Sequence, residues 1–142
     1  MTRRFLPLVA ALTLALAAVG CGNDDDNNTP TAPSTPTTVT ETYADSIGRN
    51  GARTHNFTSS SSGLVNATLT TLAPDSTLVV GFSLGTWNAS AASCQLVITN
   101  DAATQGTVVT GGVSALGSLC VRIYDVGNIT GTISYEITVV HP

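Results

Sequence analysis

Residues 133–139 read ISYEITV, a stretch in which apolar side chains alternate with polar ones. This period of two is typical of a β-strand that buries one face and exposes the other. The stretches VNATLT at 65–70 and LVVGFSL at 78–84 alternate in the same way. Shorter runs of strand-forming residues lie at 54–58, 94–99, 107–110 and 119–124, and we predict that they are strands as well. The pattern therefore predicts β-structure from residue 41 onward.

Turn-forming residues separate these runs, and seven or eight short strands in about 100 residues predict an antiparallel β-sandwich. Only 10% of the 142 residues are charged, Lys is absent, and Ser, Thr, Val and Gly are abundant. This composition argues against a helical protein. Because the chain has a net charge of −4 and no basic stripe, we also expect no nucleic-acid partner.

The first twenty residues resemble a bacterial lipoprotein signal peptide. Arg3 and Arg4 precede an apolar run over 5–19, which is shorter than a membrane-spanning helix requires. The residues Ala18-Val19-Gly20-Cys21 then resemble a lipobox. The resemblance implies cleavage before Cys21, lipid on its thiol and a membrane anchor in a bacterial envelope. Because Gly22 rather than Asp follows, the outer membrane is favoured. The alternative is an ordinary secreted protein in which Cys21 is a spare thiol.

Residues 21–40 are expected to form a disordered linker between this anchor and the domain at 41–142. An Asp/Asn run at 23–28 is followed by a Thr/Pro-rich stretch at 29–38. Such a composition favours extended, solvated chain and cannot build a core. The three consecutive Asp residues are similar to the surface-export signals of some bacterial lipoproteins, and a plain solvating spacer is the alternative.

With Cys21 assigned to lipid, Cys94 and Cys120 remain as one pair in an oxidising compartment. We expect them to form a disulfide. A reactive or metal-binding pair is the other interpretation, but it lacks C-x-x-C spacing and a nearby His.

The order of three segments resembles that of bacterial pre-peptidase C-terminal domains. The segments are THNFT with GLVNATL at 54–69, SCQLVITND at 93–101, and LCVRIY with YEITV at 119–139. The resemblance covers the whole domain and implies a jelly-roll-like β-sandwich that accompanies secreted enzymes and sometimes binds carbohydrate or collagen. The chain departs from that pattern at Cys94 and Gln95, where the family often has acidic residues, and it has no catalytic neighbour.

One catalytic-looking motif is present, because GFSLG at 81–85 fits G-x-S-x-G and is followed by Asp101 or Asp125 and then His141. A nucleophile elbow requires a strand, a sharp turn and a helix. Here the alternation places Ser83 within a strand, and His141 is expected in a frayed terminus. We therefore predict no enzymatic activity and no cofactor.

Candidate binding residues are sparse. Trp87 is expected in a loop, where with Asn88 and Tyr124 it could stack on a sugar ring; the alternative is that Trp87 caps the sandwich core.

Three loop carboxylates, Asp75, Asp101 and Asp125, are weak calcium candidates. Without a D-x-D cluster they are better interpreted as solvated turn residues.

Together these observations predict a membrane-anchored envelope lipoprotein that displays a non-catalytic module for binding a glycan or an extracellular protein. The alternative is a structural or assembly component of the envelope without a separable ligand, and a hydrolase is a distant third.

Overall fold

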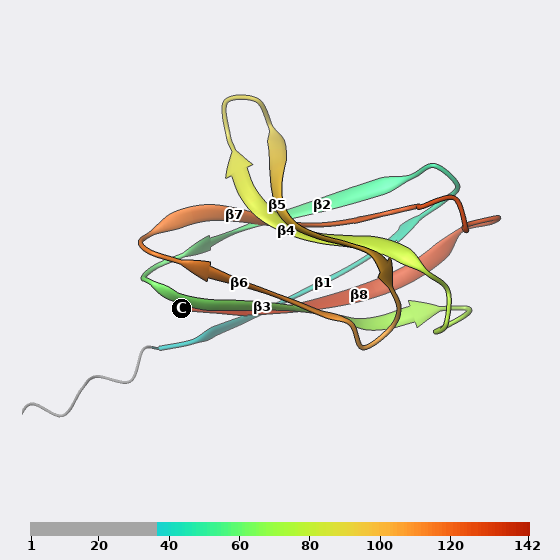
Figure 1. Cartoon of the computed structure of the whole chain (residues 1–142), viewed down its shortest axis with the longest axis horizontal. Coiled ribbons are helices and arrows are strands. Elements are labelled where there is room, and N and C mark those ends of the chain that lie inside the picture. The colour runs from blue at the N-terminus through green and yellow to red at the C-terminus, as the bar shows by residue number, and fades with distance from the viewer. Residues whose placement is uncertain (1–36) are drawn as a thin grey trace, which may run out of the picture. The chain divides into compact units, whose positions relative to one another are not determined.

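A computed structural model describes residues 37–142, which form eight antiparallel strands and no helix (Figure 1). The strands are β1 (Val39–Ile47), β2 (Ala52–Ser59), β3 (Gly63–Ala73), β4 (Val80–Asn88), β5 (Ser93–Ala103), β6 (Val108–Val113), β7 (Gly117–Tyr124) and β8 (Ile133–His141). Within this part of the chain no helix is long and apolar enough to cross a membrane. The leader at 1–20, Cys21 and most of the linker lie outside the described residues.

The strands pair into two four-stranded sheets, ordered β1-β8-β3-β6 and β2-β7-β4-β5. Successive strands mostly alternate between the two sheets, which is the double Greek-key arrangement of an eight-stranded jelly roll. The expected jelly-roll-like sandwich is therefore confirmed.

The core lies between the sheets and is built by the predicted alternation. In β3 the side chains of Val65, Ala67 and Leu69 are fully buried, while their neighbours in the strand are partly or fully exposed. In β8 the buried positions run from Ile133 to His141 at every second residue. β4 departs from the pattern because Val80 to Gly85 are buried on both faces.

The strand that alternation did not reveal is β1. Its inward positions include Glu41 and Tyr43 rather than a row of aliphatic residues. These two polar groups contact His141 and His55 inside the sandwich, so the strand contributes to the interior without showing an apolar stripe.

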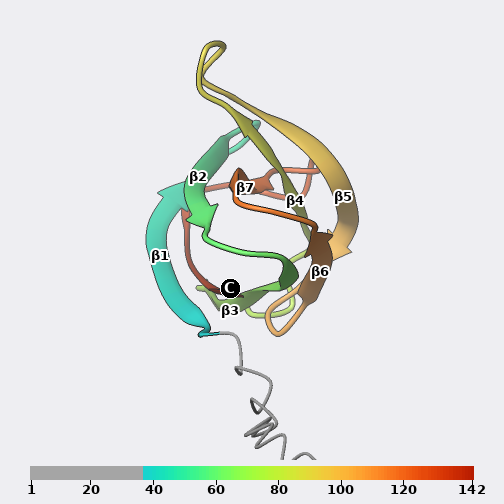
Figure 2. The same cartoon turned by 90° about the vertical axis from the view of Figure 1, so that its left-hand side faces the viewer.

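The loops collect at two ends of the sandwich. The entry end contains the start of β1, the C-terminus and the three loops at 60–62, 89–92 and 114–116. Figure 1 shows the start of β1, the C-terminus and the loops at 60–62 and 114–116 at the left, with the β4–β5 hairpin projecting upward from the sandwich, and Figure 2 looks onto this end. The far end contains the four loops at 48–51, 74–79, 104–107 and 125–132.

Candidate functional site

A cleft of about 240 Å³ opens at the far end between the β3–β4 and β7–β8 loops. Its lining combines the polar residues Asp75, Asn128, Thr130 and Thr132 with the apolar Pro74, Leu78 and Ile133. Carboxylate, amide and hydroxyl groups on one small opening can exchange several hydrogen bonds with a hydroxyl-rich ligand.

The carboxylate of Asp125 holds the β7–β8 side of this cleft. Its Oδ1 accepts hydrogen bonds from the backbone N–H groups of Gly127, Asn128 and Ile129 at 2.7–3.0 Å. Its Oδ2 accepts one from the N–H of Asn50 at 2.8 Å. These donors, Asn50 first among them, lower the pKa of Asp125, because each stabilises the charged form. The loop is thus fixed by a residue that directly follows β7.

Two further contacts hold the opposite side. Asp75 Oδ1 accepts hydrogen bonds from the side chain and the backbone N–H of Thr77 at 2.7 and 2.8 Å, which lower the pKa of Asp75. The Asn128 amide donates to the carbonyl of Val79 at 3.2 Å. The two loops are therefore linked just before β4 begins.

Tyr124 is the last residue of β7 and lies at the far end, outside the lining of this cleft. Its hydroxyl donates to the carboxylate of Asp101 in β5, and the Arg122 guanidinium carbon lies 5.9 Å from its ring centroid. Burial, followed by the hydrogen bond to Asp101, raises the pKa of Tyr124. The half-buried ring covers the backbone of Gly81 in β4. Tyr124 is thus the one predicted ligand-binding residue that the structure places near the far end.

Trp87 and Asn88 lie instead at the end of β4, in the β4–β5 hairpin that projects from the sandwich (Figure 1). The expectation that Trp87 occupies a loop is wrong, because it pairs with Cys94 within the β4–β5 hairpin. Its side chain is partly exposed. The Asn88 side chain accepts a hydrogen bond from the N–H of Ala91 in the hairpin turn. Six residues of strand, roughly 20 Å at 3.3 Å per residue, separate Trp87 from the position that pairs with Tyr124. One patch containing all three residues is not formed.

The Gly-Phe-Ser-Leu-Gly motif has a packing explanation. Ser83 lies within β4, as expected, and its fully buried Oγ has no hydrogen-bond partner. A Cβ on Gly81 would overlap the Tyr124 ring, and one on Gly85 would overlap the backbone of Gln95. Both glycines therefore allow other groups to lie directly on the outer face of β4. His141 belongs to the other sheet and its end is not frayed, because its side chain is only 2% exposed.

The three calcium candidates do not converge. Asp75 and Asp125 lie in different far-end loops, and Asp101 lies within β5 rather than in a loop. Each carboxylate already accepts hydrogen bonds from protein donors. Within residues 37–142 no group of three or more His, Cys, Asp or Glu side chains is arranged to hold a metal ion.

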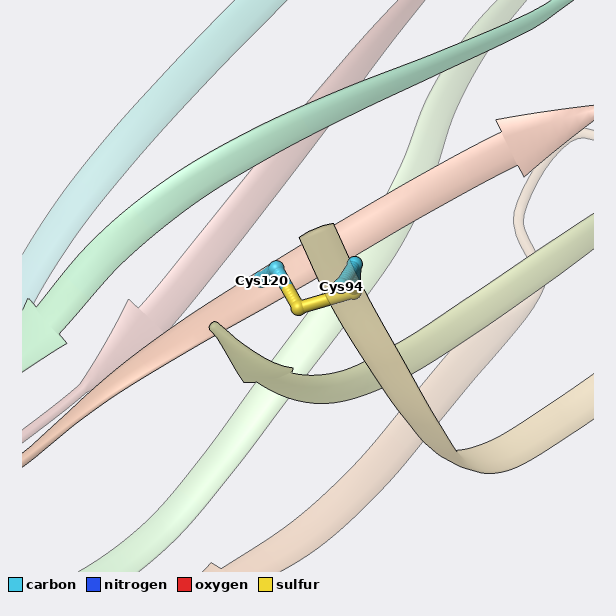
Figure 3. The surroundings of a disulfide bond; sticks show 2 residues. All are labelled: Cys94 and Cys120. Atoms are coloured by element: carbon cyan, nitrogen blue, oxygen red, sulfur yellow. A yellow bond between two sulfur atoms is a disulfide. The ribbon is translucent and has the colours of Figure 1, made fainter. Parts of the chain in front are cut away.

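Cys94 and Cys120 form the expected disulfide, with their Cα atoms 5.8 Å apart. Figure 3 shows the two side chains meeting from β5 and β7. Because β4 lies between these strands in the sheet, the bond crosses β4. It does so beside Gly85, which pairs with Cys120.

The sequence did not lead us to predict a cluster of polar and aromatic side chains where β1 meets β2 and β8. His55 stacks on Tyr43 with ring centroids 4.7 Å apart, and its Nε2 lies 2.8 Å from the Tyr135 hydroxyl. Burial lowers the pKa of His55 and raises those of both tyrosines. The sequence could have indicated this cluster, because His55 and Tyr135 occupy inward positions of strands that show the alternating pattern.

The buried His141 extends this cluster toward the entry end. Its Nε2 lies 3.1 Å from Glu41 Oε1, and its ring packs against Phe57 at 5.0 Å between centroids. The hydroxyl of Ser59 donates to the carbonyl of Pro142 at 3.2 Å. These contacts fasten the last residues of the chain to the sandwich.

A second opening, an uncharged groove of about 310 Å³, lies at the entry end between the edges of the two sheets. Its lining includes Leu84, Val97, Gly111 and Leu116, together with serine and threonine. A Cβ on Gly111 would overlap Leu84, so the absence of a side chain there keeps this edge of the core close-packed.

A scan against protein-family models found no match for this chain, and a search of the curated proteins found none either.

Proposed function

We propose that this protein is a lipid-anchored component of the bacterial cell envelope whose non-catalytic jelly roll binds a glycan through its far end. The observation that carries this proposal is the far-end cleft, whose lining includes Asp75, Asn128, Thr130 and Thr132 and which lies at the end opposite the start of β1. A module attached through its N-terminus presents that opposite end to its surroundings. The Cys94–Cys120 disulfide supports an oxidising compartment.

The chemistry of the cleft favours a glycan over a protein. The lining combines hydrogen-bonding groups with the small apolar residues Pro74, Leu78 and Ile133, whereas protein-binding hot spots are typically large aromatic or Arg anchors in well-packed pockets. The half-buried ring of Tyr124, at the same end of the sandwich, is a further flat surface on which a sugar ring can stack.

A glycan array tests the proposal with the full-length protein solubilised from membranes. The probes are neutral hexose and N-acetylhexosamine oligosaccharides. We expect Asn128→Ala and Thr130→Ala to weaken binding about tenfold each, since one hydrogen bond contributes about 1.4 kcal/mol or less. Ser62→Ala, at the exposed entry end, is the matched control and should bind as the wild type does.

Two outcomes would contradict the proposed site. If Trp87→Ala removes binding while Asn128→Ala retains it, the ligand binds at the β4–β5 hairpin, as the sequence-based interpretation of Trp87 predicts. If no glycan binds the wild type, the module is not a glycan receptor of this class.

The anchor requires a separate test. Mass spectrometry of the mature protein should find an N-terminus at Cys21 that carries acyl chains. An unmodified chain that begins at another residue would refute the lipoprotein assignment.

A further inference from the structure

The two ends of the sandwich differ sharply in charge. The three entry-end loops consist of Ser60-Ser61-Ser62, Ala89-Ser90-Ala91-Ala92 and Ser114-Ala115-Leu116, none of which is charged. The far-end loops carry Arg49, Asp75 and Asp125. The acidic residue nearest the start of β1 is Glu41, and its carboxylate bonds with Tyr43 and His141. The entry end therefore has no charged loop residue that would have to lose its hydration on contact with an apolar surface.

Exposed aliphatic side chains gather at that same end. Leu64, at the start of β3, and Leu116, in the β6–β7 loop, are 66% and 70% exposed, although each lies next to a neighbour that is buried or half-buried. Val39, the first residue of β1, is also exposed there, whereas the exposed Leu96 and Val97 lie along β5 and Val108 begins β6 at the far end. Such a distribution indicates contact with an apolar or interfacial environment.

The surroundings of these side chains also suit an interface. The uncharged groove extends from the β6–β7 loop at this end along β5, between Leu116 and Val97.

We propose that the entry end docks on the surface of the lipid bilayer, with Leu64 and Leu116 inserted at the headgroup boundary. This inference rests on the proposed lipid anchor at Cys21. The described part of the chain enters the sandwich at Val39, on the very end that lacks charge. Residues 39 and 21 are 18 positions apart, and the extended Thr/Pro-rich linker that the sequence predicts would span at most about 56 Å at ~3.1 Å per residue, so the anchor keeps the entry end within reach of the bilayer.

The anchor makes the weak contact effective. A few aliphatic side chains bind a bilayer only transiently by themselves, but tethering keeps their local concentration high. Residues 37–142 contain three Arg and six acidic residues, so attraction to anionic lipid does not drive the contact. The docked orientation points the far-end cleft away from the membrane, as its proposed role requires.

A pair of matched tryptophan probes tests the docking. Both are introduced into the full chain with Trp87→Phe, one as Leu116→Trp at the entry end and one as Val108→Trp at the far end. The acylated proteins are reconstituted into phosphatidylcholine vesicles with or without brominated acyl chains, which quench nearby indole emission. We expect about a twofold loss of emission for the Leu116→Trp protein, since interfacial insertion reaches 5–10 Å into the boundary, and little loss for the Val108→Trp protein.

Adding Leu64→Glu to the entry-end probe should restore the emission, while adding Thr110→Glu should not. Equal emission from both probes, or quenching that Leu64→Glu does not relieve, would overturn the docking. If the N-terminus proves unacylated, the free Cys21 thiol can be coupled to a maleimide lipid and the same comparison made. The quenching comparison therefore tests docking even if the native protein carries no acyl chain, so failure of the anchor and failure of docking can be told apart.

Discussion

The aromatic ring of Tyr124 lies on the backbone of Gly81, so that the outer face of β4 is covered by a side chain from β7. The contact requires a residue without a Cβ. It also positions the Tyr124 hydroxyl to donate to Asp101 in β5. One tyrosine in this way spans three strands of a sheet at the far end of the sandwich.

Gly81→Ala should destabilise the domain by about 1–3 kcal/mol, the usual cost of adding a methyl group to a packed site. The new Cβ would overlap the Tyr124 ring. The ring must then move off β4, and the Tyr124 hydroxyl loses its hydrogen bond to Asp101. Urea unfolding of the purified variant measures the change. In a Tyr124→Ala background the same substitution should cost much less, because the ring is already absent.

Gly112→Ala serves as the control, since nothing lies within 4 Å of a Cβ at that position in β6. It should leave stability unchanged or slightly raised. Equal losses for Gly81→Ala in the two backgrounds would show that the ring contact is not the cause.

Removing the disulfide as Cys94→Ser with Cys120→Ser should lower the free energy of unfolding by about 3–4 kcal/mol on the chain-entropy account. The bond closes a loop with a sequence separation of 26, and this restriction of the unfolded chain is lost in the double variant. Urea titrations of the wild type with and without reductant provide the comparison. Reduced wild type and double variant should agree; a variant as stable as the oxidised protein would contradict the prediction.

The stability of the domain should fall as the pH drops below about 6.5, the ordinary pKa of His. Burial lowers the pKa of His55 in the folded protein, and Arg53 acts in the same direction while Asp45 opposes it. Below pH 6.5 the unfolded chain therefore binds this proton before the folded domain does, and unfolding is favoured. Above that pH the contribution of His55 is fully retained.

His55→Gln removes this titration and should flatten the dependence of melting temperature on pH between 7.5 and 5.5. His141 stays in place in both proteins, so their difference isolates His55. An NMR titration that finds the pKa of His55 at or above 6.5 would count against the explanation.

Asp125→Ala should lower the melting temperature more than Asp75→Ala. The carboxylate of Asp125 accepts four backbone N–H groups from two loops, whereas that of Asp75 bonds only within its own loop, to Thr77. Because both pKa values are lowered, both contributions are present at neutral pH and are lost as the pH falls through the folded-state values. Differential scanning calorimetry at pH 7 decides the order, and a larger effect at Asp75 would refute it.

Alternation predicted most of the sandwich because most inward positions are aliphatic. The stretches at 65–70, 78–84 and 133–139 became β3, β4 and β8 with their expected faces buried. β1 was not predicted because its interior contacts are polar and aromatic, and those partners come from strands that the sequence does not place beside it. Long-range pairing of this kind leaves no local periodicity.

The candidate site was harder to predict for a related reason. The far-end cleft is built by two loops that meet only in the fold, so the spacing of Asp75 and Asn128 carries no signal. Trp87 was assigned to a loop because Gly85 precedes it, yet that glycine continues the strand and admits the crossing backbone of Gln95. The disulfide, in contrast, followed from counting cysteines once Cys21 had been assigned to lipid.

The crossing of β4 by the Cys94–Cys120 bond has a kinetic consequence. β5 is an edge strand, and edge strands ordinarily peel away first in local openings of a sheet. Here the start of β5 cannot separate from β4 without moving β7 as well. The amide hydrogens of β4 near Gly85 should therefore exchange with solvent only when the whole domain unfolds, and reduction of the bond should open a faster local route.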